Sequence, residues 1–469
     1  MSAPDLRAPF NWPVLRIAPG QSLAINTPSP ATSAPNGGWL RVTVSVDDRE
    51  EKLLSVRLPS SPRELGVIDL RYAHSLEPFQ LRLSAADYAT AARKGVVLTL
   101  TQATTPLILL AHDLPADATP LAPQLIADVP TDRLAAFFDL LASRASAQTF
   151  GWMEGCVLDA LHDLHIATGE PRWRAALDAH FALFITPDNQ LIYENPRGHP
   201  ADNVLYGIEG TLPFAQLAKI SPAHPLLDLA LDFFRQKLNA DGTFAHPESI
   251  TAEGSYTVAY PLAVLAQTRR DPALATLSSN VLRVRRDSLR RPDGLWLRHH
   301  PDDTRTFRSW ARGVAWYLLG LGRSLEHLEG LTDTADLKTE FLAAATCALG
   351  YQRADGLWGN FLDDDATRYD TSGSAGIAAA LARGANAGLL PADTFFPAAT
   401  RCWNALPAHL TPDGFLDGVA QSNRGGEPLQ RGPYRVLSPM GMGLMGQLSA
   451  ALNLFSCSSA SSSPPFASH

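Results

Sequence analysis

Two side chains of the segment Trp310-Ala-Arg-Gly-Val-Ala-Trp316 have the chemistry and the spacing to bind an acidic sugar. Arg312 and Trp316 are four residues apart, so on a helix they share one face. A guanidinium binds a planar carboxylate through paired hydrogen bonds, and an indole ring can pack on the C–H face of a sugar. We expect such a site here. The alternative is that Trp316 lies in the core while Arg312 pairs with a nearby Asp.

Two carboxylates stand at the starts of predicted helices. Asp202 lies in the segment Asp202-Asn-Val-Leu-Tyr-Gly207, and Glu253 precedes a segment that is apolar through Ala266. Each has an ordinary explanation, because Asp202 fits a helix N-cap and Glu253 fits a first-turn acid that complements the helix dipole. A pair of carboxylates also serves general acid–base catalysis when burial raises the pKa of one member. Both explanations stay open.

A hydroxyl-rich segment, Arg368-Tyr-Asp-Thr-Ser-Gly-Ser374, opens another predicted helix. The hydroxyls of Ser372 and Ser374, together with the free backbone N–H groups of the first turn, could hold an anionic or hydroxylated ligand. Asp370 or Thr371 could instead simply cap the helix. The two interpretations are compatible.

The histidines and cysteines do not indicate a metal centre. His299 and His300 fall on a predicted loop, and neither has the spacing of a metal ligand to another His or Cys. The cysteines are far apart and form no Cys-x-x-Cys motif: Cys156, Cys347, Cys402 and Cys457. We therefore predict free thiols, no metal and no cofactor.

The candidate residues fall in a region with helical periodicity. From about residue 131 the apolar period is 3.6, and turn signals recur every 52 to 62 residues, from Asp188-Asn189 to Asp413-Gly414. A repeat of this length with two helices predicts stacked helical hairpins, and six hairpins can close into an (α/α)6 toroid. Twelve helices are predicted, near 131–147, 152–167, 171–185, 203–219, 223–238, 255–269, 272–290, 309–328, 334–351, 372–388, 393–408 and 438–454.

The N-terminal region follows a different pattern. Over residues 1–128, short segments alternate with period two, as in Leu40-Arg-Val-Thr-Val-Ser-Val46, and Pro and Gly occupy the gaps. We expect a small β-sandwich-like domain there, a helical catalytic domain over 129–455, and a disordered Ser/Pro-rich tail over 456–469. The β-rich domain is interpreted as a structural module. The alternatives are a carbohydrate-binding module or a flap that completes a pocket in the other domain.

Composition excludes several classes of protein. The 469 residues are 45% hydrophobic and 18% charged, with a formal net charge of -8 and no basic tract. We therefore expect neither a nucleic-acid nor a membrane partner. The N-terminus has no charged segment followed by an apolar one, so we expect a cytoplasmic location. The sequence gives no indication of the oligomeric state.

Taken together, the motifs resemble the unsaturated uronyl hydrolases of glycoside hydrolase families 88 and 105. The resemblance covers roughly residues 130–455 and leaves the first domain outside. It is carried, in order, by Gly151-Trp-Met-Glu-Gly155, Asp202, Glu253-Gly-Ser-Tyr256, Gly294-Leu-Trp-Leu-Arg-His299, Trp310-Ala-Arg-Gly-Val-Ala-Trp316 and Thr371-Ser-Gly-Ser-Ala375.

The resemblance implies a six-hairpin toroid and a substrate with a terminal uronic acid that carries a C4=C5 double bond. In these families an aspartic acid protonates C4, water adds at C5, and neither metal nor organic cofactor is needed. By position, Asp202 and Glu253 would be the acid/base residues. Arg312 and Trp316 would face the uronyl ring. Further substrate contacts are expected from the other matching segments: Trp152, Tyr256, His299, Ser372 and Ser374.

Glu253 departs from the family pattern, because it stands where the resemblance places a catalytic aspartate. The extra methylene extends the carboxyl group by about 1.5 Å, and a displacement of that size can cost about a hundredfold in rate. The family's hydration chemistry is one outcome. Hydrolysis of a saturated uronide by the Asp202–Glu253 pair, or sugar binding without catalysis, are the others.

Our prediction is a hydrolase of uronic-acid oligosaccharides, and other classes remain as alternatives. An epimerase on the same toroid would use two histidines, for which His246 and His299 are the candidates. A lyase would use a Tyr and His pair, with Tyr206 or Tyr256 as the tyrosine. A binding protein would use the β-rich domain.

Overall fold

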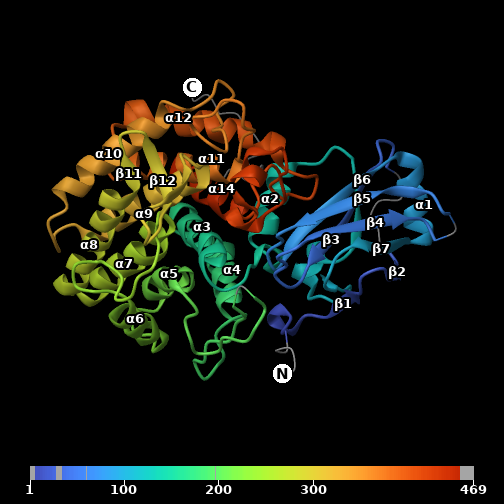
Figure 1. Cartoon of the computed structure of the whole chain (residues 1–469), viewed down its shortest axis with the longest axis horizontal. Coiled ribbons are helices and arrows are strands. Elements are labelled where there is room, and N and C mark those ends of the chain that lie inside the picture. The colour runs from blue at the N-terminus through green and yellow to red at the C-terminus, as the bar shows by residue number, and fades with distance from the viewer. Residues whose placement is uncertain (1–5, 28–33, 60, 196, 455–469) are drawn as a thin grey trace, which may run out of the picture.

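A ring of helices and a β-rich domain against one side of it make up the computed structural model (Figure 1). The structure describes residues 6–27, 34–59, 61–195 and 197–454. The predicted tail over 456–469, with Cys457, lies outside the described residues. The other three cysteines are free and lie in helices. Within the described ranges, every helix is too short or too polar to cross a membrane.

Six inner helices form a closed ring in which each contacts the next and the last returns to the first. This ring is the toroid that the repeat predicts. Its members are α3 (Trp152–Thr168), α5 (Pro213–Ile220), α7 (Tyr260–Arg269), α9 (Ala311–Leu328), α11 (Thr371–Asn386) and α14 (Pro439–Leu452). Close approach explains its small residues: a Cβ on Gly320 of α9 would overlap the backbone of Ser255, just before α7.

Six outer helices surround the ring, and each contacts at least one inner helix. They are α2 (Arg133–Leu141), α4 (Pro171–Phe181), α6 (Leu226–Lys237), α8 (Pro272–Leu289), α10 (Ala335–Leu349) and α12 (Ala392–Ala405). The first outer helix, α2, packs on the last inner helix, α14, so the two ends of the helical region close the ring. A short helix α13 (Gly426–Arg431) was not expected from the sequence.

One predicted helix begins ten residues later than expected. The segment predicted from residue 203 is a series of turns, with a short 3₁₀ helix at Ile208–Thr211, and α5 itself starts at Pro213. Proline is favoured at the first helical position because it lacks an N–H that would be unsatisfied there. Glu209 therefore lies before α5, at the mouth of the ring, and not in the interior of a helix.

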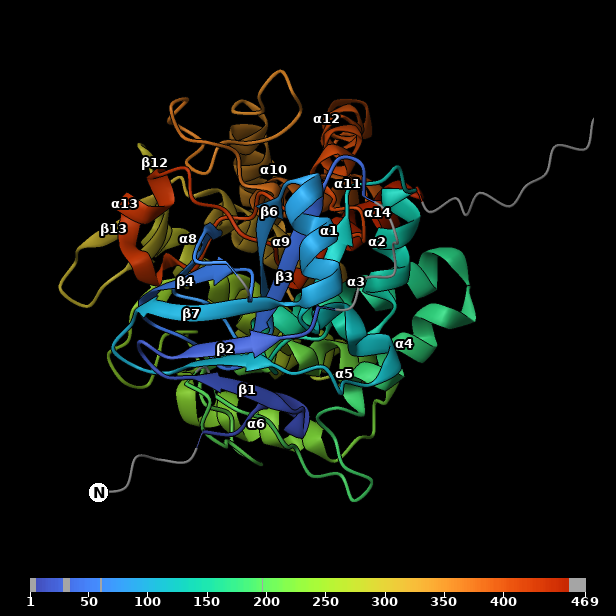
Figure 2. The same cartoon turned by 90° about the vertical axis from the view of Figure 1, so that its right-hand side faces the viewer.

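The N-terminal domain contains two antiparallel sheets (Figure 2). The first has the order β1 (Val14–Ile17), β8 (Leu107–Leu110), β3 (Gly38–Val44) and β6 (Glu77–Leu83), and β9 (Gln124–Ala127) also pairs with β3. The second has the order β2 (Ser22–Ile25), β7 (Val96–Gln102), β4 (Glu51–Arg57) and β5 (Glu64–Arg71). The N-terminal region is therefore rich in β-strands, as predicted, while its bounds as a domain and its arrangement as a sandwich stay predictions.

One helix of this domain was missed by the period-two pattern. Helix α1 (Ala85–Lys94) follows β6 and begins at Ser84, whose hydroxyl accepts a hydrogen bond from the backbone N–H of Asp87. Ser at the N-cap and basic residues in the last turn are ordinary helix signals.

Polar contacts join the two domains. Arg41 of β3 is fully buried, forms an ion pair with Asp413, and lies over the ring of Phe415 at 4.5 Å. The Tyr434 hydroxyl donates to the backbone carbonyl of Asp69 at 2.8 Å. Because these partners belong to the last part of the helical region, the β-rich domain is fixed over one end of the ring.

Candidate active site

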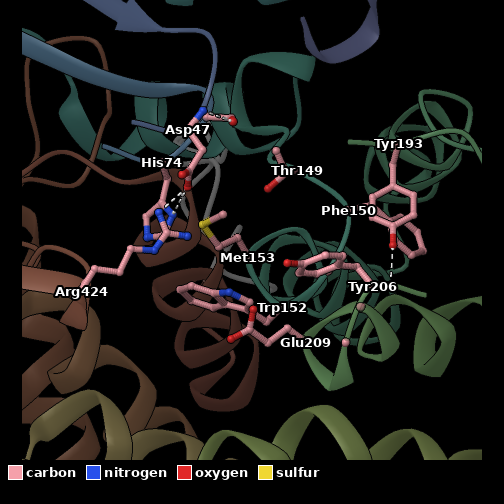
Figure 3. Close-up of a pocket in the computed structure, with 14 residues that line it drawn as sticks. Asp47, His74, Thr149, Phe150, Trp152, Met153, Tyr193, Tyr206, Glu209 and Arg424 are labelled. Atoms are coloured by element: carbon pink, nitrogen blue, oxygen red, sulfur yellow. Dashed lines mark hydrogen bonds and ion pairs between the residues drawn. The ribbon is translucent and has the colours of Figure 1, made fainter. Parts of the chain in front are cut away.

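A pocket lies where the β-rich domain meets the ring of helices (Figure 3), and we call it the interdomain pocket. Its empty space is about 520 Å³, including the mouth that opens to solvent. Side chains of both domains line it: Asp47, His74 and Ser75 from the β-rich domain, and Thr149, Phe150, Trp152, Met153, Tyr193, Tyr206, Glu209 and Arg424 from the helical region. The β-rich domain therefore completes the pocket, as in the flap alternative.

Glu209 and Asp47 are the carboxylates that line this pocket. Glu209 lies on the 3₁₀ helix that precedes α5. The residue as a whole is exposed at the pocket, while protein packs closely around its carboxyl group. Burial and the negative charge of Glu253 raise its pKa to about 7.

Glu253 stands at the equivalent place on the next inner helix. It follows β10 (Ile250–Thr251) and precedes a π-helical turn at Ser255–Ala259 that continues into α7. The buried Arg285 of α8 holds this turn, because its Nε donates to the carbonyl of Thr251 at 3.1 Å. A Cβ on Gly254 would overlap the Arg285 guanidinium, so a glycine is needed beside Glu253.

Three guanidinium groups, those of Arg424, Arg298 and Arg49, act on Glu209 and favour its charged form. Arg424 forms an ion pair with Asp47, and Arg49 bonds to the same carboxylate at 3.1 Å. Arg298 lies on β12 (Gly294–His299), and its guanidinium forms neither a hydrogen bond nor an ion pair with any residue that the structure describes. Of the three arginines, Arg424 lines the pocket itself.

The loops that carry Asp47 and His74 are joined to each other. The backbone N–H of Asp47 donates to the Ser75 hydroxyl, and that of Asp48 donates to the carbonyl of Ala73, both at 2.8 Å. Burial and the charge of Arg424 lower the pKa of His74 well below its ordinary value, so its imidazole is neutral. The β-rich domain therefore presents a preformed wall to the pocket.

The predicted aromatic residues form a column, of which only the top faces the pocket. Trp152 is half-buried and lines the pocket, with the ring of His74 at its edge at 6.0 Å. Trp316 is buried beneath it at 5.5 Å, and Tyr256 stacks on Trp316 at 5.8 Å. The Tyr256 hydroxyl donates to Asp159 inside the ring. Trp316 and Tyr256 thus support Trp152 from below.

A buried polar network fills the axis of the ring below Tyr256. Asp159 accepts hydrogen bonds from the hydroxyl of Tyr260 and from Gln216, and Arg323 forms an ion pair with Asp163. Burial lowers the pKa of Lys219, whose ammonium donates to the Tyr260 hydroxyl at 2.6 Å, to about 8. This network closes the ring below the pocket.

Asp202 is not brought to the pocket. Its carboxylate forms an ion pair with Arg7 at 2.6 Å and accepts a hydrogen bond from the backbone N–H of Tyr193 at 3.1 Å. The Arg7 guanidinium holds the pKa of Asp202 below its ordinary value. Asp202 therefore fastens the N-terminal segment to the loop before α5.

Arg312 lies behind Trp152 and His74, in a small cavity that adjoins the pocket. Its Nη1 and Nη2 donate to the carbonyls of Ala420 and Gln421 at 2.7 and 2.8 Å. Its Nε is buried without a hydrogen-bond partner among the described residues, and each terminal nitrogen has a second N–H, so the carboxylate contact expected from the sequence stays a prediction.

Three further predicted residues also lie away from the pocket. The Ser372 hydroxyl donates to Asp370 at 2.7 Å, and the Ser374 hydroxyl accepts from the backbone N–H of Trp358 at 2.9 Å, so both hold the start of α11. His299 ends β12, where its Nε2 lies 2.7 Å from the carboxylate of Asp303. The local capping interpretation therefore describes the two serines.

Sequence reasoning missed Glu209, Arg424 and His74. One signal could have found the first: Glu209-Gly210 and Glu253-Gly254 are the same dipeptide at the starts of successive inner helices. Arg424 and His74 carry no comparable local signal, because they reach the pocket only through the packing of the two domains.

Comparison with known proteins finds a family for the helical region. The model of Glycosyl Hydrolase Family 88 matches residues 138–451. A curated relative, the unsaturated 3S-rhamnoglycuronyl hydrolase of Formosa agariphila, is 33% identical over 132 residues, which is 27% of this chain and 34% of that protein. The match thus spans about a third of the relative's length.

Solved structures share the fold at low sequence identity. A family 105 glycoside hydrolase from C. acetobutylicum matches with a TM-score of 0.57 at 18% identity, over 66% of this chain and 95% of that chain. The unsaturated glucuronyl hydrolase of Bacillus sp. GL1 matches with a TM-score of 0.51 at 18% identity, over 69% and 95%. These likenesses establish the fold of the helical region.

Proposed function

The chain belongs to glycosyl hydrolase family 88, and we propose that it removes a terminal 4,5-unsaturated uronic acid from an oligosaccharide by hydrating the C4=C5 bond. The observation that carries this proposal is Glu209, which lines the interdomain pocket with Arg424 and whose pKa is raised by burial and by the charge of Glu253. The activity named for the Formosa relative supports the same reaction class.

In the proposed reaction, protonated Glu209 gives its proton to C4, and a water molecule adds to C5 while Glu253 takes the proton that this water loses. A pKa of about 7 keeps a large fraction of Glu209 protonated at neutral pH. The product is a hemiketal at C5. Its ring C–O bond breaks to give a ketone at C5 and a hemiacetal at C1, which then releases the remaining sugar as an alcohol.

The residues around the interdomain pocket also provide the proposed substrate contacts. We assign the uronate carboxylate to two arginines near the proposed acid, Arg298 and Arg424. Arg312, behind Trp152, remains a further candidate because its Nε has no partner among the described residues. Trp152 offers its exposed edge to the sugar ring. His74 is neutral, so it can accept or donate a hydrogen bond without repelling the arginines.

The test uses unsaturated disaccharides from pectin-lyase and glycosaminoglycan-lyase digests and follows the ultraviolet absorbance of the conjugated uronate. The wild-type protein should abolish this absorbance. Glu209→Gln and Glu253→Gln should each slow the loss by about 10²–10⁴-fold, which is the usual contribution of a general acid or base. Asp202→Asn, which removes a carboxylate outside the pocket, should retain activity.

Absence of any absorbance loss with the wild-type protein would overturn the hydration proposal. The same carboxyl pair also fits ordinary hydrolysis of a saturated uronide, in which one carboxyl is the acid and the other the base or nucleophile. Aryl glucuronides and galacturonides separate the two reactions, because they have no double bond to hydrate.

A further inference from the structure

A second depression, which we call the β-domain groove, adjoins the interdomain pocket. Its empty space is about 1020 Å³, including the part open to solvent. Asp47 lines both the groove and the pocket, so the two are continuous at this residue. Charged side chains dominate its lining: Arg16, Asp48, Arg49, Glu50, Lys52 and Arg197.

The acidic groups of the groove are already satisfied. Asp48 forms an ion pair with the buried Lys52, and Asp47 does so with Arg424. Glu50 accepts hydrogen bonds from the backbone N–H of Thr104 at 2.9 Å and from its hydroxyl at 2.7 Å, and these bonds lower its pKa to about 2 against the effect of burial. None of these carboxylates needs a cation from a ligand.

Two arginines of the groove remain without such partners. Arg16 of β1 and Arg197, on the loop before α5, are exposed, and neither guanidinium forms a hydrogen bond or an ion pair within the described part of the chain. Arg49 stands between them and the pocket, since it lines the groove and its charge also acts on Glu209. The arginines of the groove thus continue the positive charge from the interdomain pocket outward, away from Glu209 and Glu253.

We propose that the sugars beyond the terminal uronyl unit lie in the β-domain groove, where their carboxylate or sulfate groups bind to Arg16 and Arg197. The inference rests on the proposed function, because it assumes that the terminal unit occupies the interdomain pocket. Guanidinium groups bind carboxylates and sulfates by the same charge-assisted hydrogen bonds. An acidic tetrasaccharide is therefore a better substrate than the corresponding disaccharide.

The experiment compares kcat/KM for an unsaturated disaccharide and an unsaturated tetrasaccharide from one lyase digest. The Arg16→Ala/Arg197→Ala protein should lose about three- to tenfold more kcat/KM on the tetrasaccharide than on the disaccharide. The matched control, Arg93→Ala/Lys94→Ala, removes two exposed positive charges from α1 of the same domain and should match the wild type. Added salt should reduce the tetrasaccharide preference.

Sulfated and unsulfated tetrasaccharides identify which anion the groove binds. An equal loss on both points to carboxylates, and a larger loss on the sulfated one points to sulfates. If the ratio of kcat/KM for the tetrasaccharide to kcat/KM for the disaccharide is unchanged in the double variant, the proposed binding in the groove is overturned, while the proposed function stays intact.

If no substrate is turned over, the proposed function fails, and calorimetric titration with the acidic tetrasaccharide still tests the groove. Weaker binding by the double variant than by its control then supports oligosaccharide binding in the groove, and equal binding overturns this proposal. A neutral tetrasaccharide of glucose should show no difference between these two variants.

Discussion

Glu209 lies in surroundings that disfavour its charged form. Its pKa of about 7, against an ordinary 4.5, means that the folded protein keeps a proton that the unfolded chain has already lost. Between these two values the folded state binds more protons than the unfolded state, so stability falls as pH rises. The loss of folding stability reaches its full value above about pH 7 and is absent below about pH 4.5. The proposed catalytic acid thus destabilises the folded protein at neutral pH.

Glu209→Gln should therefore raise the melting temperature at about pH 8 and leave it unchanged at about pH 4, because it removes the cost of charging this site. Thermal denaturation of the variant and the wild type at both pH values provides the measurement. Asp202→Asn is the matched control, and its expected change in melting temperature has the opposite sign. The pKa of Asp202 is lowered by Arg7, so its loss should reduce the melting temperature at the higher pH. A Glu209→Gln protein that is less stable than wild type at about pH 8 would contradict the assigned pKa.

The inner helices approach one another through glycine and alanine more closely than larger residues allow. Gly320 of α9 touches the backbone at Ser255, and Gly443 of α14 touches the backbone at Cys156 of α3. The close pair at Ser255 lies two residues from Glu253. Packing between α9 and the start of α7 therefore also fixes the position of a proposed catalytic carboxylate.

Gly320→Ala should destabilise the protein by about 1–3 kcal/mol, because the added Cβ forces two backbones apart. Chemical denaturation measures this loss, and kcat for the unsaturated disaccharide should fall because Glu253 moves. The control is Gly350→Ala at the end of α10, where φ is -60° and the nearest atom would lie 3.4 Å from the new Cβ. Equal stabilities of the two variants would show that the ring tolerates the wider spacing.

Both domains line the interdomain pocket, so their relative position determines its shape. Arg41 is buried with its ion pair to Asp413, and Gln421 donates to Glu77 at 3.0 Å across the same boundary. Burial raises the pKa of Glu77 to about 8. The β-rich domain is therefore an integral wall of the pocket.

Arg41→Ala should destabilise the protein by about 3 kcal/mol, because it leaves Asp413 without its buried partner. In differential scanning calorimetry the wild type should unfold in one transition, and the variant should separate the β-rich domain into an earlier one. Arg82 lies on β6, the strand next to β3, and forms an exposed ion pair with Asp128. Arg82→Ala should reduce the free energy of unfolding by less than about 1 kcal/mol. Identical traces for Arg41→Ala and Arg82→Ala would mean that Arg41 does not join the domains.

Local periodicity determined the helices and the ring, because a helix or turn depends on residues that are near in the sequence, and the resemblance of short motifs indicated the family. The twelve predicted helices are present, and the motifs around Trp152 and Glu253 lie at the ring mouth. Which side chains face the pocket depended on tertiary structure. Asp202 forms an ion pair with Arg7, so a residue type that suits catalysis holds the N-terminal segment in place instead. His74 and Arg424, which are 350 positions apart in the chain, meet only because the domains pack together, and no local pattern encodes a contact over that separation.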